Sequence, residues 1–155
     1  MEDFLKKDYI LLVEDSPDNA TLTLLALKRH NIDNEVVVVR DGSEVLDYLF
    51  ATGPYAGRDI DLPPRLILMD LKLPKLNGLE VLRRLRSSDQ TKFLPIIIFT
   101  SSCNEGDIEE CLQCGANSYI RKPVDFDMFS ETLHQVVFYW LSLNIPAPIV
   151  RTRKS

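Results

Sequence analysis

Five short, mostly apolar runs recur along this chain, and four of them are rich in Val, Ile and Leu. They are Tyr9–Val13, Glu35–Arg40, Arg65–Met69, Pro95–Phe99 and Ser118–Ile120. Their residues do not alternate strictly between apolar and polar, which is typical of strands buried on both faces of a parallel sheet. We therefore expect five strands in the interior of one domain.

The segments between these runs have helical features. Ser16 can cap a helix that has Pro17 at its first position and ends near His30. In that helix we expect a buried stripe of Leu22, Leu25, Ala26 and Leu27. Later helices follow the turn Asp41-Gly42-Ser43, open at Gly78, cover Asp107–Cys114, and extend from Asp125 to about Leu143.

Strands that alternate with helices predict an α/β fold, a doubly wound five-stranded parallel sheet with helices on both faces. The segment Thr52–Pro64 contains two glycines and three prolines and is expected to be irregular. This pattern divides the chain into an extension at 1–8, one domain at 9–143 with an inserted loop at 52–64, and a tail at 144–155.

Charge and hydropathy exclude several classes of function. The 155 residues carry a formal net charge of -5, which argues against nucleic-acid binding through a basic face. No apolar run approaches the roughly 18 residues that a membrane span needs, and the N-terminus lacks a signal-peptide core. We expect a cytoplasmic protein whose three cysteines are reduced thiols.

Polar residues follow four of the predicted strands at the point where each strand ends. Glu14-Asp15 follows the first, Asp70 the third, Thr100-Ser101 the fourth and Lys122 the fifth. Because the carboxyl ends of parallel strands meet at one edge of an open sheet, these side chains should gather there. An aspartate, acids, a hydroxyl and an ammonium together suit the Mg²⁺-assisted phosphorylation of a carboxylate.

The charges of this group favour one divalent cation. Glu14, Asp15 and Asp70 bring three negative charges and Lys122 returns one, so a single Mg²⁺ would balance the remainder. Asp15 and Asp70 can be direct ligands, Glu14 can hold a metal-bound water, and the Lys72 carbonyl is a third possible ligand. Lys122, the Thr100 hydroxyl and the backbone N–H of Ser101 can then contact phosphoryl oxygens.

Four motifs carry a family resemblance that spans about Tyr9 to Trp140: LLVEDS, LILMDLKLPKLNGLEVL, PIIIFTSS and GANSYIRKPVD. The chain resembles the receiver domain of response regulators, the CheY-like module of two-component signalling. The resemblance implies strand order 2-1-3-4-5 and a signalling switch rather than an enzyme with a separate substrate. It also implies a cis Lys122–Pro123 bond.

The same resemblance assigns roles to the residues at the strand ends. Asp70 would be the phosphoacceptor, and Glu14 and Asp15 the acid pair around Mg²⁺ or Mn²⁺. Thr100 would be the switch hydroxyl, Lys122 the phosphate-pairing lysine and Tyr119 the switch aromatic.

The Thr52–Pro64 insertion and the Leu143–Ser155 tail resemble small stand-alone regulators that partner bacterial, chiefly cyanobacterial, phytochrome histidine kinases. A phosphohistidine on such a separate kinase would be the donor. His30 and His134 lie in predicted helices and are interpreted as surface or core residues. Phosphorylation would change the surface formed by the helix at 107–114, the strand at 118–120 and the last helix.

The last helix also predicts a partner surface. Phe126, Phe129, Leu133, Val136, Val137 and Trp140 share one face, whereas Phe138 and Tyr139 point away from it. Exposed aromatic side chains favour interfaces, so we expect a homodimer through this face. In the alternative, Phe138 is an isolated exposed ring that the Leu143–Val150 tail covers.

Four other functions compete with the receiver hypothesis. A thiol oxidoreductase would use Cys111 and Cys114, but redox pairs usually begin a helix, and core packing is the more common role of a free cysteine. An aspartyl phosphatase would need a second acid where Lys72 stands. An FMN-binding flavodoxin would need a hydroxyl- and glycine-rich loop in place of Glu14–Asp18, and a receiver that works without phosphorylation would not need Asp70, Thr100 and Lys122.

Overall fold

The computed structural model describes residues 8–102 and 104–148, and its centre is a five-stranded parallel sheet. The strands are β1 (Tyr9–Val13), β2 (Glu35–Val39), β3 (Leu66–Met69), β4 (Ile96–Thr100) and β5 (Ser118–Arg121). Their order in the sheet is β2-β1-β3-β4-β5, which confirms the predicted fold class and topology. Residues 1–7 of the predicted extension, Cys103, and residues 149–155 of the predicted tail lie outside the described residues.

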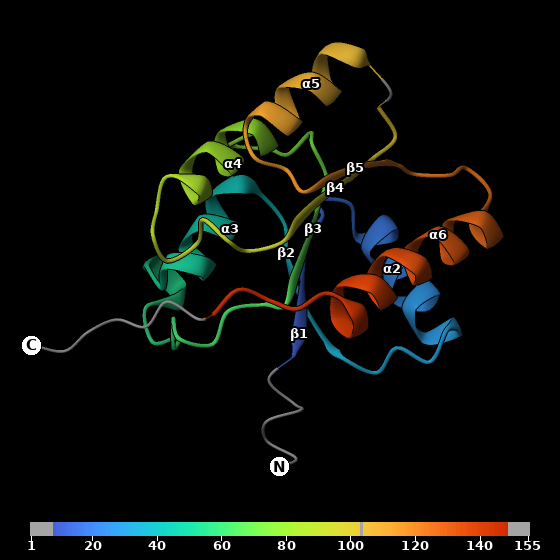
Figure 1. Ribbon diagram of the computed structural model, residues 1–155, viewed down its shortest axis with the longest axis horizontal. Helices are drawn as coiled ribbons and strands as arrows, with labels where there is room; N and C mark the ends of the chain where they lie inside the picture. The colour runs from blue at the N-terminus through green and yellow to red at the C-terminus, as the bar shows by residue number, and fades with distance from the viewer. Residues whose placement is uncertain (1–7, 103, 149–155) are drawn as a thin grey trace, which may run out of the picture.

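The helices form a layer on each face of the sheet (Figure 1). Helices α2 (Pro17–Arg29) and α6 (Phe126–Phe138) cover one face, and α3 (Gly42–Phe50), α4 (Gly78–Arg86) and α5 (Glu105–Gln113) cover the other. Helix α5 begins two residues before the predicted start because the Asn104 side chain accepts the backbone N–H groups of Gly106 and Asp107. The last helix reaches Leu143 as predicted, but residues Tyr139–Leu143 have π-helical winding.

The predicted stripe of α2 is half wrong. Ala26 and Leu27 are buried, but Leu22 is 43% exposed and Leu25 is 52% exposed. The helix instead turns Ala20 and Thr23 toward the sheet, at a spacing of three residues that continues to Ala26. Two leucines therefore face solvent on the helix that begins beside the predicted site.

Two apolar clusters hold the layers together. One joins β1, β3 and β4 to α3, α4 and α5, and the other joins the same strands to α2 and α6. Strands β1 and β3 are buried at every position, as their unbroken apolar runs predict, while the edge strands β2 and β5 are mostly half-buried.

The Lys122–Pro123 bond is trans, contrary to the expectation from the family resemblance. No cis peptide bond occurs in residues 8–102 or 104–148. The trans isomer is the lower in energy for most bonds that precede proline, by roughly 0.5–1 kcal/mol.

The inserted segment 52–64 is irregular apart from a 3₁₀ turn at Gly53–Tyr55. Arg58 attaches it to the end of α3, because its guanidinium donates to the carbonyl oxygens of Tyr48 (2.5 Å) and Leu49 (3.2 Å) and stacks on the Tyr48 ring. The Arg65 guanidinium donates to the Asn144 carbonyl at 3.2 Å. Residues 146–148 and 60–65 line one cavity of about 320 Å³, which lies at the amino ends of β1, β3 and β4 and so away from their carboxyl ends.

Gly42 lies where the start of α3 meets the loop between β3 and α4. A Cβ at Gly42 would overlap the backbone carbonyl of Leu76, and the Gly42 N–H already donates to the Pro74 carbonyl at 3.4 Å. The loop that follows Asp70 is therefore held against α3 by a contact that admits only glycine.

We expect Gly42→Ala to lower the free energy of unfolding by about 2 kcal/mol, since backbone and not a flexible side chain must move. Urea denaturation measures the change. Gly57→Ala is the matched control, because a Cβ at Gly57 meets nothing within 4 Å. Equal stabilities for the two variants would contradict the assigned contact.

The part of the chain that the structure describes has no helix with the length and apolar character to cross a bilayer.

Candidate functional site: an acidic pocket at the carboxyl ends of the strands

Backbone hydrogen bonds place the four predicted strand-end residues at one edge of the sheet. The N–H of Glu14 donates to Val39 O (2.9 Å) and that of Asp70 to Val13 O (3.2 Å). The N–H of Lys122 donates to the carbonyl of Thr100, the last residue of β4, at 2.7 Å. Each of these groups is fixed by an extension of the strand pairing, so the sheet itself sets the positions of these site residues.

The three acidic residues converge as predicted. Glu14, Asp15 and Asp70 each offer a carboxylate oxygen, and these oxygens lie within 4.8 Å of one another. Glu14 is only 3% exposed, Asp70 is half-buried and Asp15 is exposed. The pocket is therefore open on the Asp15 side and closed behind Glu14.

Lys122 joins two of these acids. Its ammonium donates to Glu14 Oε1 at 2.8 Å and to Asp70 Oδ2 at 3.4 Å. Three carboxylates and one ammonium leave two negative charges in a small volume. Hard oxygen ligands with this excess charge are the set that Mg²⁺ or a similar cation takes in proteins.

Local backbone donors orient the carboxylates. The N–H of Ser16, the cap of α2, donates to Glu14 Oε2 at 3.3 Å, and that of Lys72 donates to Asp70 Oδ1 at 3.3 Å. Asp70 therefore has one oxygen held by its own loop and the other by Lys122. The roles predicted for the Lys72 carbonyl and the Ser101 N–H stay predictions.

Thr100 and Tyr119 are linked through Ser102, a connection that the sequence did not indicate. The buried Thr100 Oγ1 accepts the N–H of Ser102 at 3.4 Å, and the Tyr119 hydroxyl donates to the Ser102 carbonyl at 3.0 Å. The Ser102 hydroxyl also donates to Asp107 of α5 at 3.1 Å. Its position two residues after Thr100 was the available signal, but only the fold brings Tyr119 to the same residue.

The cysteine pair does not have the features of a redox site. Cys111 is buried in the core, and this burial raises the pKa of its thiol to about 11, whereas redox cysteines have lowered pKa values. Cys114 stands at the carboxyl end of α5, not at its start. Core packing, the alternative interpretation, is confirmed for Cys111.

The last helix presents the predicted aromatic face. Phe138 is 49% exposed and Tyr139 is 46% exposed, while Phe129, Leu133 and Val137 are buried. The described part of the tail does not cover these rings, because residues 146–148 instead line the cavity beside the insertion. Phe138 does contact the ring of His134, with 6.0 Å between centroids.

Comparison with known proteins places most of the chain in one family. The sequence model of the response regulator receiver domain matches residues 10–134. The response regulator Rcp1 of Synechocystis sp. is 33% identical, covering 89% of this chain and 92% of Rcp1. The probable methanogenesis regulatory protein FilR2 of Methanothrix harundinacea is 35% identical, covering 87% and 84% of the two chains.

Solved structures give the same result. The phosphorylated cyanobacterial phytochrome response regulator RcpA is similar with a TM-score of 0.83 and 35% identity, covering 91% of this chain and 99% of RcpA. The bacteriophytochrome response regulator RtBRR is 45% identical with a TM-score of 0.72, covering 91% and 84%. The Mn²⁺-bound form of Rcp1 matches with a TM-score of 0.82 and 31% identity, covering 91% and 99%.

Proposed function

Because this chain belongs to the response-regulator receiver family, we propose that it is a phosphorelay switch that accepts a phosphoryl group on Asp70 from a histidine kinase. The observation that carries the proposal is the shared Lys122 ammonium, which donates to both Glu14 and Asp70 inside the acidic cluster. A carboxylate with this surrounding is positioned to act as a nucleophile toward a phosphoryl group whose charge must be neutralised.

In the proposed step a carboxylate oxygen of Asp70 forms a bond to phosphorus, and the bond from phosphorus to the donor's histidine nitrogen breaks. The nitrogen keeps the electron pair, and the product is an aspartyl-phosphate. Glu14, Asp15, Asp70 and the Lys72 carbonyl are the groups that would hold Mg²⁺ or Mn²⁺, and a bound ion supplies positive charge at the phosphoryl oxygens. The relative Rcp1 has a Mn²⁺-bound form, which supports the proposal that this chain also binds a divalent ion.

The remaining residues would contact the oxygens of the phosphoryl group. Lys122 would exchange its bond with Asp70 for one with a phosphoryl oxygen. The Thr100 hydroxyl accepts from Ser102 but keeps its own proton for donation, and the Ser101 N–H would contact another oxygen.

The link through Ser102 supports a route from the pocket to the surface. If Thr100 turns toward the phosphoryl group, its bond with the Ser102 N–H changes, and the Tyr119 hydroxyl bonds to that same residue. We propose that Tyr119 and the surface of α5, β5 and α6 respond together, as a two-state element biased by new charge.

The partner class follows from the relatives. RcpA and RtBRR are a cyanobacterial phytochrome and a bacteriophytochrome response regulator, so we propose a phytochrome-type histidine kinase in the cytoplasm as the donor. The relative FilR2 is a probable methanogenesis regulatory protein, and it favours the alternative that the donor is a histidine kinase of another type. Incubation with a purified phytochrome kinase and with a non-phytochrome kinase separates the two, since only the cognate donor should transfer within minutes.

Asp70→Asn tests the phosphoacceptor. Treatment of the native chain with acetyl phosphate and Mg²⁺ should raise its mass by one phosphoryl group, and the variant should show no increase, because an amide oxygen is a poor nucleophile. Intact-mass spectrometry reads both. Asp61→Asn, in the inserted loop, is the matched control and should label fully; labelling of the Asp70 variant would refute the assignment.

Phe138 and Tyr139 support the proposal of a homodimer through α6. Phe138→Glu should shift the chain from dimer to monomer in sedimentation velocity, since a charge would have to be buried at the interface. Leu22→Glu is the control, because Leu22 is similarly exposed on α2. An unchanged dimer in the Phe138 variant would remove this residue from the interface.

A further inference from the structure

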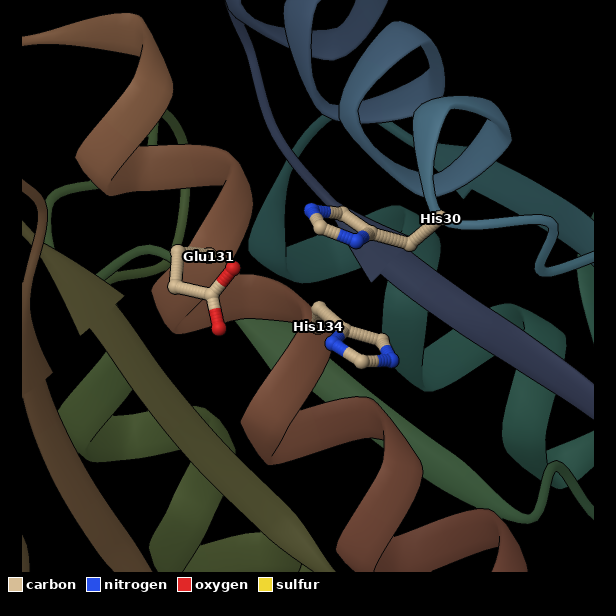
Figure 2. Close-up of side chains that lie close together, drawn as sticks. All are labelled: His30, Glu131 and His134. Atoms are coloured by element: carbon tan, nitrogen blue, oxygen red, sulfur yellow. The ribbon is translucent and has the colours of Figure 1, made fainter.

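Two histidines and a glutamate meet where the end of α2 packs on α6 (Figure 2). His30 caps the carboxyl end of α2, and Glu131 and His134 are three residues apart on one face of α6. One ligand atom from each of the three lies within 4.8 Å of the other two. These are the only two histidines among the 155 residues, and the fold brings them together from positions 104 apart in the chain.

The His30 ring has an unmet bonding requirement. Its Nε2 atom is shielded from solvent and has no hydrogen-bond partner among the described residues. A polar atom in that condition is uncommon in folded proteins, because its desolvation is not repaid. Figure 2 shows the carboxylate of Glu131 beside both rings, with a nitrogen of each ring turned to its side.

We propose that His30, Glu131 and His134 form a second metal site, which takes a transition-metal ion of the zinc type. Two imidazoles and one carboxylate are a common set of protein ligands for zinc, with a water in the fourth position. Imidazole selects such ions over Mg²⁺, which prefers the all-oxygen set of the acidic pocket. The two sites lie at opposite ends of α2, a helix of 13 residues and so about 20 Å long.

The surrounding charges permit a cation here. The carbonyl groups at the carboxyl end of α2 create a partial negative charge beside His30. The neighbouring Arg29 guanidinium is already neutralised by Asp127 of α6, at 2.6 Å. Glu131 has one oxygen engaged by Gln135 at 3.4 Å and offers the other to an ion.

The rings must reorient when the ion binds. The His30 and His134 rings are stacked, with 4.3 Å between centroids and 6° between planes. A metal binds in the plane of an imidazole, along the nitrogen lone pair, and two parallel planes cannot share one ion. Binding therefore opens the stack, and one ion then joins α2 to α6.

Zinc titration of the full chain in saturating Mg²⁺ tests the site. We expect one Zn²⁺ per chain by calorimetry, a higher melting temperature, and affinity that persists in the Asp15→Asn/Asp70→Asn variant. His30→Gln and His134→Gln should each weaken binding at least roughly tenfold, as the loss of even an outer-shell partner often does. Nuclear magnetic resonance should show the ring signals of both histidines shifting together.

Glu131→Gln and Glu109→Gln are a matched pair. Each glutamate is on a helix surface and accepts a hydrogen bond from the glutamine four residues later, at 3.4 Å. Only Glu131 has histidines beside it. The first variant should lose affinity and the second should not. Both positions are exposed, so neither change threatens the fold.

Cobalt absorption separates this site from the cysteines. Co²⁺ bound by imidazole and carboxylate gives no thiolate charge-transfer band in the near ultraviolet, and we expect none. The proposal is overturned if that band appears, if native protein binds no zinc, or if either histidine variant or Glu131→Gln binds as tightly as native protein.

Discussion

Lys122→Met should lower the free energy of unfolding in metal-free buffer by about 2–3 kcal/mol and reduce the rate of phosphoryl uptake by about a hundredfold. The stability loss follows from Glu14, whose carboxylate is 3% exposed and lies in a pocket with two further acids. Without the ammonium at 2.8 Å, a buried carboxylate loses its cation. The expected loss of stability is smaller than the usual cost of breaking a fully buried pair, because Lys122 itself is partly exposed.

A second variant isolates this cause. Glu14→Gln/Lys122→Met removes both charges, so it should recover most of the lost stability while phosphoryl uptake stays slow. Urea denaturation and rate measurements with acetyl phosphate provide the two readouts. If the double variant is as unstable as Lys122→Met alone, the loss arises from packing of the lysine stem and not from the charge of Glu14.

Arg86→Ala should cost about 3 kcal/mol of stability and lower the melting temperature by roughly 10 °C. The Arg86 guanidinium donates to the carbonyls of Gly115 (2.9 Å), Lys92 (3.0 Å) and Leu94 (2.8 Å), and to Asn117 Oδ1 (2.9 Å). Burial lowers the pKa of this group, which marks how far it is withdrawn from water. Its removal leaves several carbonyls before β4 and β5 without their donor.

The same helix supplies the controls. Arg83 and Arg84 are more than half exposed and pair only with Glu80 through 3.6 Å and 3.1 Å contacts, so their alanine variants should change stability by less than about 0.5 kcal/mol. Arg86→Lys keeps the charge but not the planar guanidinium, so its loss of stability should be smaller than that of Arg86→Ala and larger than those of the Arg83 and Arg84 variants. Calorimetry measures all four, and equal melting temperatures for the three alanine variants would contradict the assigned network.

The sheet and the acidic cluster could be predicted because both depend on strand ends. An unbroken apolar run predicts a buried strand, and the residues that follow parallel strands lie together at the carboxyl edge of the sheet. The positions of Glu14, Asp70 and Lys122 could therefore be predicted from the strands alone. Side-chain direction on α2 could not be predicted in the same way. Leu22 and Leu25 fit a helical stripe as well as Ala20 and Thr23 do, and only packing against α6 decides which stripe is buried.

Contacts between distant segments were also beyond the sequence. The link from Thr100 to Tyr119 runs through the backbone N–H and carbonyl of Ser102, and any residue except proline could supply those atoms. The meeting of His30 with His134 depends on the lateral position of α2 on α6, which no local pattern encodes. The trans Lys122–Pro123 bond likewise departs from an expectation that rested on the family resemblance alone.

Arg58 gives the inserted segment an unusual freedom to evolve. Its guanidinium contacts the main-chain oxygens of Tyr48, Leu49, Asp59 and Leu62. Main-chain oxygens are present whatever the side chain, so substitutions at 59 and 62 leave this anchor intact. Descendants of one ancestral gene could therefore diversify the outer face of this segment while the sheet beneath keeps the same chemistry.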